Sequence, residues 1–141
     1  LAKPSVDFAT RLALIAWGSM ILSDFASEEL KQEILPRVAT GDLKLSFSLT
    51  EPNSGSDAAS LQTRARRDGD DWVLTGQKLF SSGADAKDNM IIVAVRTDAS
   101  ASKHRGISLF LVPNDLPNLT IRRLETVGRK IVGLSEMTCT D

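Results

Sequence analysis

The chain has 141 residues and a formal net charge of -1, with one cysteine and one histidine. This length allows a domain with its own core, and 42% hydrophobic with 25% charged residues is typical of a globular protein. The near-neutral charge argues against nucleic-acid binding, and the absence of an apolar run of transmembrane length argues against membrane insertion. The lone Cys139 argues against an internal disulfide and against a metal site.

The first forty residues predict two helices. Apolar residues recur at three- and four-residue steps between positions 5 and 25, and polar residues are so sparse there that we expect packing on more than one side. Ser27 is a good N-cap for the second helix, because two glutamates follow it in the first turn. Pro36 is expected to interrupt or end that helix, and Gly41 to close the segment.

From residue 43 onward the pattern is that of short strands. An alternating run over residues 61–66, a turn at 68–71 and a return over 72–74 predict a hairpin. Residues 75–78 are expected to bend, after which Leu79 and Phe80 re-enter the core. Further strands are expected at residues 90–95, which should be buried on both faces, and at 107–112, 119–121 and 134–140. Such spacing without intervening helices favours an α+β fold with a mainly antiparallel β-barrel or sandwich.

A polar stretch at residues 49–57 follows the first of these strands, residues 43–48. Pro52 restricts the backbone, and Gly55 can adopt a positive φ, so the chain is expected to bend sharply. Backbone N–H groups at such a bend can point the same way, which suits an electron-rich ligand, and Thr50 and Ser56 add hydroxyls. On composition alone, an ordinary polar turn would be the simpler interpretation.

The order of residues in this stretch is more specific than its composition. It reads Phe-Ser-Leu-Thr-Glu-Pro-x-x-Gly-Ser-Asp over residues 47–57, and this run resembles the flavin-contact signature of the acyl-CoA dehydrogenase family. The pattern over residues 27–42 is similar to the last helix before that signature. The resemblance therefore implies that residues 1–42 are the C-terminal part of the N-terminal helical domain and residues 43–141 the middle β-barrel domain.

The resemblance implies a flavin-dependent α,β-dehydrogenation of acyl-CoA thioesters. In the family, a carboxylate removes the α proton, and N5 of flavin adenine dinucleotide (FAD) accepts the β hydride. That base belongs to a C-terminal helical domain, so we expect it beyond Asp141 and assign no catalytic residue to this chain. The chain begins at Leu1 rather than methionine and stops just after an alternation of apolar and polar residues, so both ends look cut. We therefore interpret it as a fragment without that domain, inactive by itself. Glu51 belongs to the flavin turn and is not expected to be the base.

The same resemblance implies the residues that contact FAD. In the first segment these are Phe47, Leu49, Thr50, Gly55 and Ser56, where Thr50 supplies a hydroxyl to the polar edge of the ring. Ser56 is also expected to contact the acyl-CoA chain.

A second flavin segment is implied by Gly76-Gln77-Lys78 and the residues up to Gly83. Phe80 could be the family's aromatic residue, or Leu79 could stand in for it, so the flavin hydroxyl could come from Ser81 or from Ser82. A serine-rich turn without a flavin is the simpler alternative.

Other interpretations stay open. An acyl-CoA oxidase or a flavin monooxygenase shares this fold, and a non-catalytic β-barrel binding or scaffold module could have kept the fold and lost the site. The dehydrogenase reading implies acyl-CoA as substrate, an electron-transfer flavoprotein or similar acceptor, and a homo-oligomeric parent protein. Bacterial cytoplasm and the mitochondrial matrix are both compatible with the composition.

Overall fold

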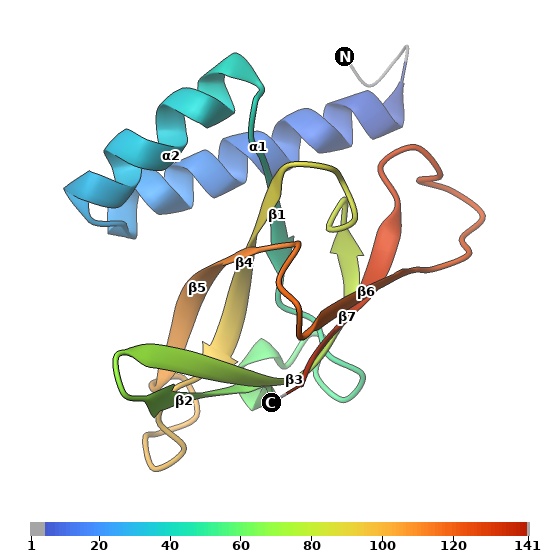
Figure 1. The fold of residues 1–141 in the computed structure, drawn as a ribbon. Helices are drawn as coiled ribbons and strands as arrows, with labels where there is room; N and C mark the ends of the chain where they lie inside the picture. Colours follow the sequence, from blue (N-terminus) through green and yellow to red (C-terminus); the bar gives the residue numbers. More distant parts are fainter. Residues whose placement is uncertain (1–4, 141) are drawn as a thin grey trace.

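A computed structural model describes residues 5–140 and shows two helices followed by a curled β-sheet (Figure 1). The helices α1 (Val6–Phe25) and α2 (Glu28–Thr40) lie together on one side of the sheet. The strands are β1 (Lys44–Ser48), β2 (Arg64–Asp68), β3 (Asp71–Ser82), β4 (Asn89–Arg96), β5 (Ile107–Pro113), β6 (Leu119–Arg123) and β7 (Leu134–Cys139), with a short 3-10 helix η1 (Ala58–Ser60). The predicted fold class is confirmed.

The sheet is mixed, with the order β1-β4-β2-β3-β7-β6, and β5 pairs with β4. The pairs β2–β3, β3–β7, β4–β5 and β6–β7 are antiparallel, as expected, and Asp68 pairs with Asp71 across the predicted hairpin turn. β1 runs parallel to β4, from Lys44 beside Asn89 to Ser48 beside Val93. The curl gives a half-barrel whose concave side holds one hydrophobic cluster.

β4 lies at the centre of the packing. Its residues Ile91, Val93 and Val95 are buried in the cluster inside the curl, whereas Met90 packs against the cluster under the helices. A strand that is covered on both faces has a continuous apolar sequence, and this run of residues made β4 recognisable from the sequence. The prediction that residues 90–95 form a strand buried on both faces is confirmed.

Helix α1 approaches β1 very closely at Gly18. A Cβ atom on Gly18 would lie 2.8 Å from Cδ1 of Leu45, whose side chain is fully buried. A glycine in the middle of a helix lowers helix stability, so its presence is explained by this close approach. The contact sets the height of α1 above β1.

Helix α2 continues through Pro36 to Thr40, so the prediction that this proline interrupts or ends the helix is wrong. Ile34 and Val38, on either side of the proline, are buried in the cluster between the helices and β1. Their burial outweighs the missing backbone hydrogen bond of the proline. The predicted ends are confirmed, because the Ser27 hydroxyl accepts a hydrogen bond from the Leu30 amide and Gly41 takes a left-handed conformation.

Helix α1 is poorly covered within the described part of the chain. Gly18 and Leu22 are its buried residues, and Trp17 and Phe25 are 66% and 80% exposed. The expected packing on several sides is therefore not made by residues 5–140. The helix has the length and mean hydropathy of a membrane span, so the expectation that no apolar run reaches transmembrane length is wrong. Core helices of soluble proteins and signal sequences share these two properties.

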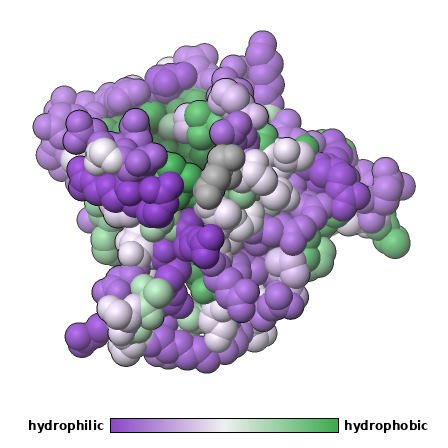
Figure 2. Space-filling model, turned by 60° about the horizontal axis from the view of Figure 1, so that its bottom comes forward, coloured by the Kyte–Doolittle hydropathy of each residue, from purple (hydrophilic) through white to green (hydrophobic). Residues whose placement is uncertain are grey.

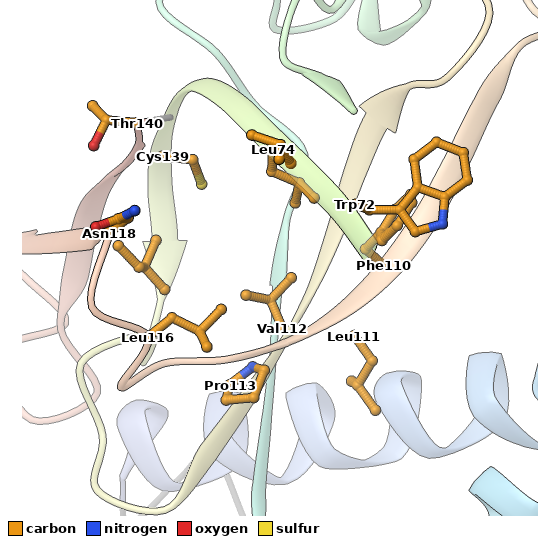
Figure 3. A pocket seen from close by; sticks show the side chains of 12 residues that line it. Trp72, Leu74, Phe110, Leu111, Val112, Pro113, Leu116, Asn118, Cys139 and Thr140 are labelled. Carbon is orange, nitrogen blue, oxygen red and sulfur yellow. The ribbon is translucent and has the colours of Figure 1, made fainter. Parts of the chain in front are cut away.

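Strand β3 differs from its prediction in two ways. The expected bend at residues 75–78 does not interrupt the strand, which runs from Asp71 to Ser82; instead β3 curves there as it changes partner, from β2 at Thr75 to β7 at Gly76 (Figure 3). Leu79 and Phe80 do not re-enter the core: the buried residue is Lys78, and Phe80 is 56% exposed. A register shift against β7 between Lys78 and Ser81 explains the difference, since a bulge changes which side chains point inward.

Candidate functional site

The two segments implicated by sequence meet in the structure. We call them the site turn (residues 49–57), which follows β1, and the β3 end (residues 78–83). The Leu79 amide donates to the Thr50 carbonyl at 2.8 Å, and the Ser48 and Ser81 hydroxyl oxygens lie 2.6 Å apart. Backbone and side-chain hydrogen bonds thus join segments about 30 positions apart in the chain.

The site turn has a compact hydrogen-bonded core. The Glu51 amide donates to the Ser54 carbonyl at 2.8 Å, and the Ser54 amide returns a bond to the Glu51 carbonyl at 3.2 Å. The Ser54 hydroxyl donates to the Asp57 carbonyl at 2.8 Å. Gly55 is not among the residues with a positive φ, and a Cβ there would meet no atom within 4 Å. The sharp bend is confirmed, but it does not depend on the special freedom of Gly55.

A buried ion pair lies beneath the turn. Lys78 Nζ is 2.7 Å from Glu51 Oε1, and the two side chains are 0% and 5% exposed. Lys78 Nζ also donates to the Leu49 carbonyl at 3.1 Å. The Glu51 carboxylate accepts from the Thr63 amide at 2.9 Å and from the Gln62 amide at 2.6 Å. Both charges are therefore compensated by hydrogen bonds, which a buried charge requires.

Burial and these contacts shift the pKa of both partners. Burial acts to raise the pKa of Glu51, but hydrogen bonds from Lys78, Thr63 and Gln62 outweigh it and hold that pKa below its usual value. Burial lowers the pKa of Lys78, and its hydrogen bond to Glu51 opposes this without cancelling it. Glu51 is therefore a buried carboxylate that accepts from three donors of this chain, the Lys78 ammonium and the Gln62 and Thr63 amides.

The residues expected on the first segment fall into three environments. Leu49 and Thr50 are half-buried, next to the hydrogen bonds that join the segments. Gly55 and Ser56 are exposed at the far end of the turn. Phe47 lines an apolar pocket of about 230 Å³ with residues of α1, including Trp17.

The residues expected on the second segment point in different directions. Phe80 has a φ of 60° at the bulge and is largely exposed. Ser81 is 1% exposed, and its hydroxyl is paired with Ser48 inside the sheet. Ser82 is 9% exposed, and its hydroxyl lies 3.3 Å from Nη1 of Arg129. Of the two serines, Ser82 has the hydroxyl that lies nearer the surface.

Sequence reasoning missed the roles of Lys78, Glu51 and Arg129. Lys78 was recognised within the Gly-x-Lys pattern but was placed in a bend, and Glu51 was treated as part of the turn. The useful signal was a charged residue inside an otherwise strand-like segment, since a buried lysine needs a buried acidic partner. Arg129 lies in a loop with no periodicity, so no sequence signal places it beside Ser82.

A larger apolar pocket, of about 380 Å³, lies apart from this site (Figure 3). Side chains from β3, β5, the loop between β5 and β6 and the C-terminal end of β7 point toward it, among them Leu74, Val112 and, from the loop, Leu116. Figure 2, which brings the β2–β3 side forward, shows apolar surface recessed between hydrophilic residues. Cys139 lines the pocket, and burial raises the pKa of its thiol, so it is not a reactive thiolate.

None of the residues expected to contact FAD or substrate lines the larger pocket. Its walls offer Asn118 and Thr140 as polar side chains, but no carboxylate or base that could act in catalysis. Among residues 5–140, no group of histidine, cysteine, aspartate and glutamate side chains could hold a metal ion.

Comparison with known proteins places this arrangement in one family. Residues 46–141 match the family described as "Acyl-CoA dehydrogenase, middle domain". Acyl-CoA dehydrogenase FadE12 of Mycobacterium tuberculosis (strain H37Rv) is 38% identical over 110 residues, which cover 78% of this chain and 28% of FadE12. Mitochondrial isobutyryl-CoA dehydrogenase of Dictyostelium discoideum is 39% identical over 125 residues, which cover 89% of this chain and 30% of that protein.

Solved structures agree. The crystal structure of a glutaryl-CoA dehydrogenase from Mycobacterium smegmatis in complex with FADH2 superposes with a TM-score of 0.78 at 37% identity, over 88% of this chain and 31% of that chain. The present chain thus spans less than a third of the length of each of these relatives.

Proposed function

The chain belongs to the acyl-CoA dehydrogenase family, and on that premise we propose that it supplies one side of an FAD site and part of the adjoining acyl-CoA pocket. The reaction we propose for the whole protein is the introduction of an α,β double bond into an acyl-CoA thioester. One observation carries the proposal: the site turn and the β3 end, recognised separately in the sequence, are joined by the hydrogen bond from Leu79 to Thr50. A relative of this fold is a complex with FADH2.

The residues present suit a flavin ring. Phe80 offers an exposed aromatic face at a bulge, a place where strands often redirect a side chain next to a functional site. Thr50 is half-buried and carries a hydroxyl, and its backbone is held on both sides, at the Leu49 carbonyl and at its own carbonyl. We assign the second hydroxyl to Ser82, because the Ser81 hydroxyl is paired with Ser48 inside the sheet. When bound, FAD would accept the hydride from the substrate.

The remaining contacts expected on this chain follow the same proposal. Leu49 and Gly55 would line the flavin side of the turn, and Ser56 at its exposed end would reach both the flavin region and the acyl-CoA. The ring of Phe47 lines the pocket against α1, so Phe47 would support the turn by packing there and would not contact the flavin through its ring.

Glu51 is unsuited to the role of base that removes the α proton. Its carboxylate is 5% exposed, accepts from two backbone amides besides Lys78, and has a lowered pKa, whereas a general base needs an accessible lone pair. We therefore place the base outside this chain, in the C-terminal helical domain of the whole protein, and propose residues 1–42 and 43–141 as parts of the helical and middle domains.

The whole protein's partners follow from the same assignment. We propose an acyl-CoA as substrate, an electron-transfer flavoprotein or a similar carrier as electron acceptor, and a homo-oligomer as the working form. Relatives from bacteria and from mitochondria support the bacterial cytoplasm or the mitochondrial matrix as the compartment.

The test is FAD binding by the polypeptide that carries residues 1–141 with its natural flanking sequence. We expect a bound flavin whose visible absorbance bleaches when an acyl-CoA is added without oxygen. Thr50→Val should weaken FAD binding or shift the flavin reduction potential, since it removes the hydroxyl and keeps the shape. A protein that folds but binds no FAD would overturn the proposal and favour a non-catalytic β-barrel module, and rapid reoxidation by oxygen would favour an acyl-CoA oxidase.

A further inference from the structure

We infer that Lys78 and Glu51 are positioning residues, which set the orientation of the Thr50 hydroxyl relative to the β3 end. The inference rests on the proposed function, since Thr50 matters only if that hydroxyl faces a flavin. The two side chains form a buried ion pair, 0% and 5% exposed, so they act on the proposed contact surface only through the residues that they hold.

Three consecutive residues of the site turn are tied to two consecutive residues of β3. The Leu49 carbonyl accepts from Lys78 Nζ at 3.1 Å, and the Thr50 carbonyl accepts from the Leu79 amide at 2.8 Å. The Glu51 carboxylate takes the remaining contact, 2.7 Å from Lys78 Nζ. The backbone on both sides of the Thr50 side chain is therefore held by one dipeptide.

The same dipeptide leads directly into the bulge that exposes Phe80. Lys78 is fully buried two positions before that ring, so it anchors the strand on one side and the turn on the other. A change at Lys78 must therefore alter the spacing between the Thr50 hydroxyl and the Phe80 ring. Within residues 5–140, no other ion pair joins these two segments.

The charge of the pair is needed for this role. Lys78 Nζ is a single point with three donors, and it divides them between a carboxylate and a carbonyl of the same turn. Charge-assisted hydrogen bonds are shorter and stronger than neutral ones, and preorganised donors act on a reacting group without reorganisation. An apolar side chain of the same length would fill the space but would leave the Leu49 carbonyl without its donor.

The experiment compares three variants of the FAD-binding protein. Lys78→Met removes the charge, Lys78→Met with Glu51→Gln removes both charges, and Lys103→Met breaks the exposed ion pair with Asp57 at the far end of the same turn. The measurements are folding stability, the FAD dissociation constant, the flavin reduction potential and visible spectrum, and amide hydrogen exchange of Leu79 without FAD.

We expect Lys78→Met to lower stability and the double variant to recover most of it, because no unpaired charge stays buried. Both should bind FAD at least about tenfold more weakly, the size expected for a lost charge-assisted hydrogen bond, and both should shift the potential and spectrum. Leu79 exchange should accelerate in both variants, with the Ile92 amide of β4 unchanged. Lys103→Met should match the wild type.

The outcomes separate the two proposals. If the wild type binds FAD and the stable double variant keeps its wild-type affinity, potential and spectrum, the positioning role is overturned and the proposed function stands. If the wild type folds but binds no FAD, the proposed function fails, and the inference fails with it.

Discussion

The hydroxyl oxygens of Ser48 and Ser81 lie 2.6 Å apart inside the sheet, one at the end of β1 and the other near the end of β3. Both side chains are 1% exposed. Neighbouring Ser82, in contrast, has its hydroxyl beside Arg129 near the surface. The two adjacent serines of β3 therefore differ in role: Ser81 stabilises the fold, and Ser82 lies at the proposed flavin surface.

Single alanine substitutions should separate these tasks. Ser81→Ala leaves the Ser48 hydroxyl buried without its partner, so we expect a loss of about 1–3 kcal/mol in the free energy of unfolding. Replacing both Ser48 and Ser81 by alanine should restore much of that loss. Ser82→Ala should change stability little and weaken FAD binding. Urea unfolding and flavin titration of the same proteins check this, and a Ser81→Ala protein as stable as wild type would contradict it.

Stability should depend on pH through Glu51. Its pKa in the folded chain is held below the value of the unfolded chain, about 4.3, so the unfolded state binds the proton more readily. The contribution of Glu51 is therefore complete above that value and is lost as the pH falls through the lower folded pKa. Urea unfolding between pH 7 and pH 3 should show this acid-side decline.

The Glu51→Gln variant tests the source of that decline. The amide cannot take up the proton, so the decline should become shallower, while at pH 7 the variant should lose about 3–5 kcal/mol because Lys78 stays buried without its counter-charge. Glu33→Gln, which removes an exposed carboxylate of α2, is the matched control. An unchanged acid-side slope in Glu51→Gln would assign the decline to other carboxylates.

Gly18→Ala should destabilise the chain although alanine is the better helix former. The new methyl group would lie 2.8–2.9 Å from Leu45 side-chain atoms that are fully buried, and such overpacking costs about 1–3 kcal/mol. Gly128→Ala is the control, because a Cβ there meets no atom within 4 Å. Thermal unfolding of both variants decides the matter, and a raised melting temperature for Gly18→Ala would show that α1 can move away from β1.

The isolated chain should self-associate through the uncovered face of α1. Trp17, Met20 and Phe25 are more than 60% exposed, and contiguous apolar surface of this kind promotes association. Replacing Trp17 and Phe25 by glutamine should weaken association at least about tenfold, measured by sedimentation velocity at several concentrations. The control is Ile131→Gln, which removes an equally exposed apolar side chain from the loop before β7.

Periodicity predicted most of the architecture because most elements bury one face in a regular way. The apolar run at residues 90–95 and the hairpin turn at Asp68–Asp71 follow from local chemistry alone. Pro36 was misjudged because its local cost is real but smaller than the burial of Ile34 and Val38, which depends on where β1 lies. The parallel pairing of β1 with β4 likewise has no local signal.

The sequence singled out the two segments of the candidate site, which the structure brings together, but it did not predict their geometry. The order of residues identified Thr50 and the Phe80 region, but a bulge decides that Phe80 points outward and Ser81 inward. A period-2 pattern cannot show where such a bulge falls, since one extra residue exchanges the two faces. The partner of Lys78 was equally hidden, because the two charges approach each other only after the chain has folded.

The parallel pairing of β1 with β4 also has a consequence for the order in which the chain folds. The hairpins β2–β3 and β4–β5 join neighbours in sequence, whereas Lys44 must find Asn89 and Glu51 must find Lys78. A pairing between distant segments loses loop-closure entropy before its stabilising contacts form, so we expect it to form late. The turn proposed to face the flavin is therefore expected to be ordered last, and φ-values near zero at Leu45 beside high values in β4 and β5 would record this sequence of events.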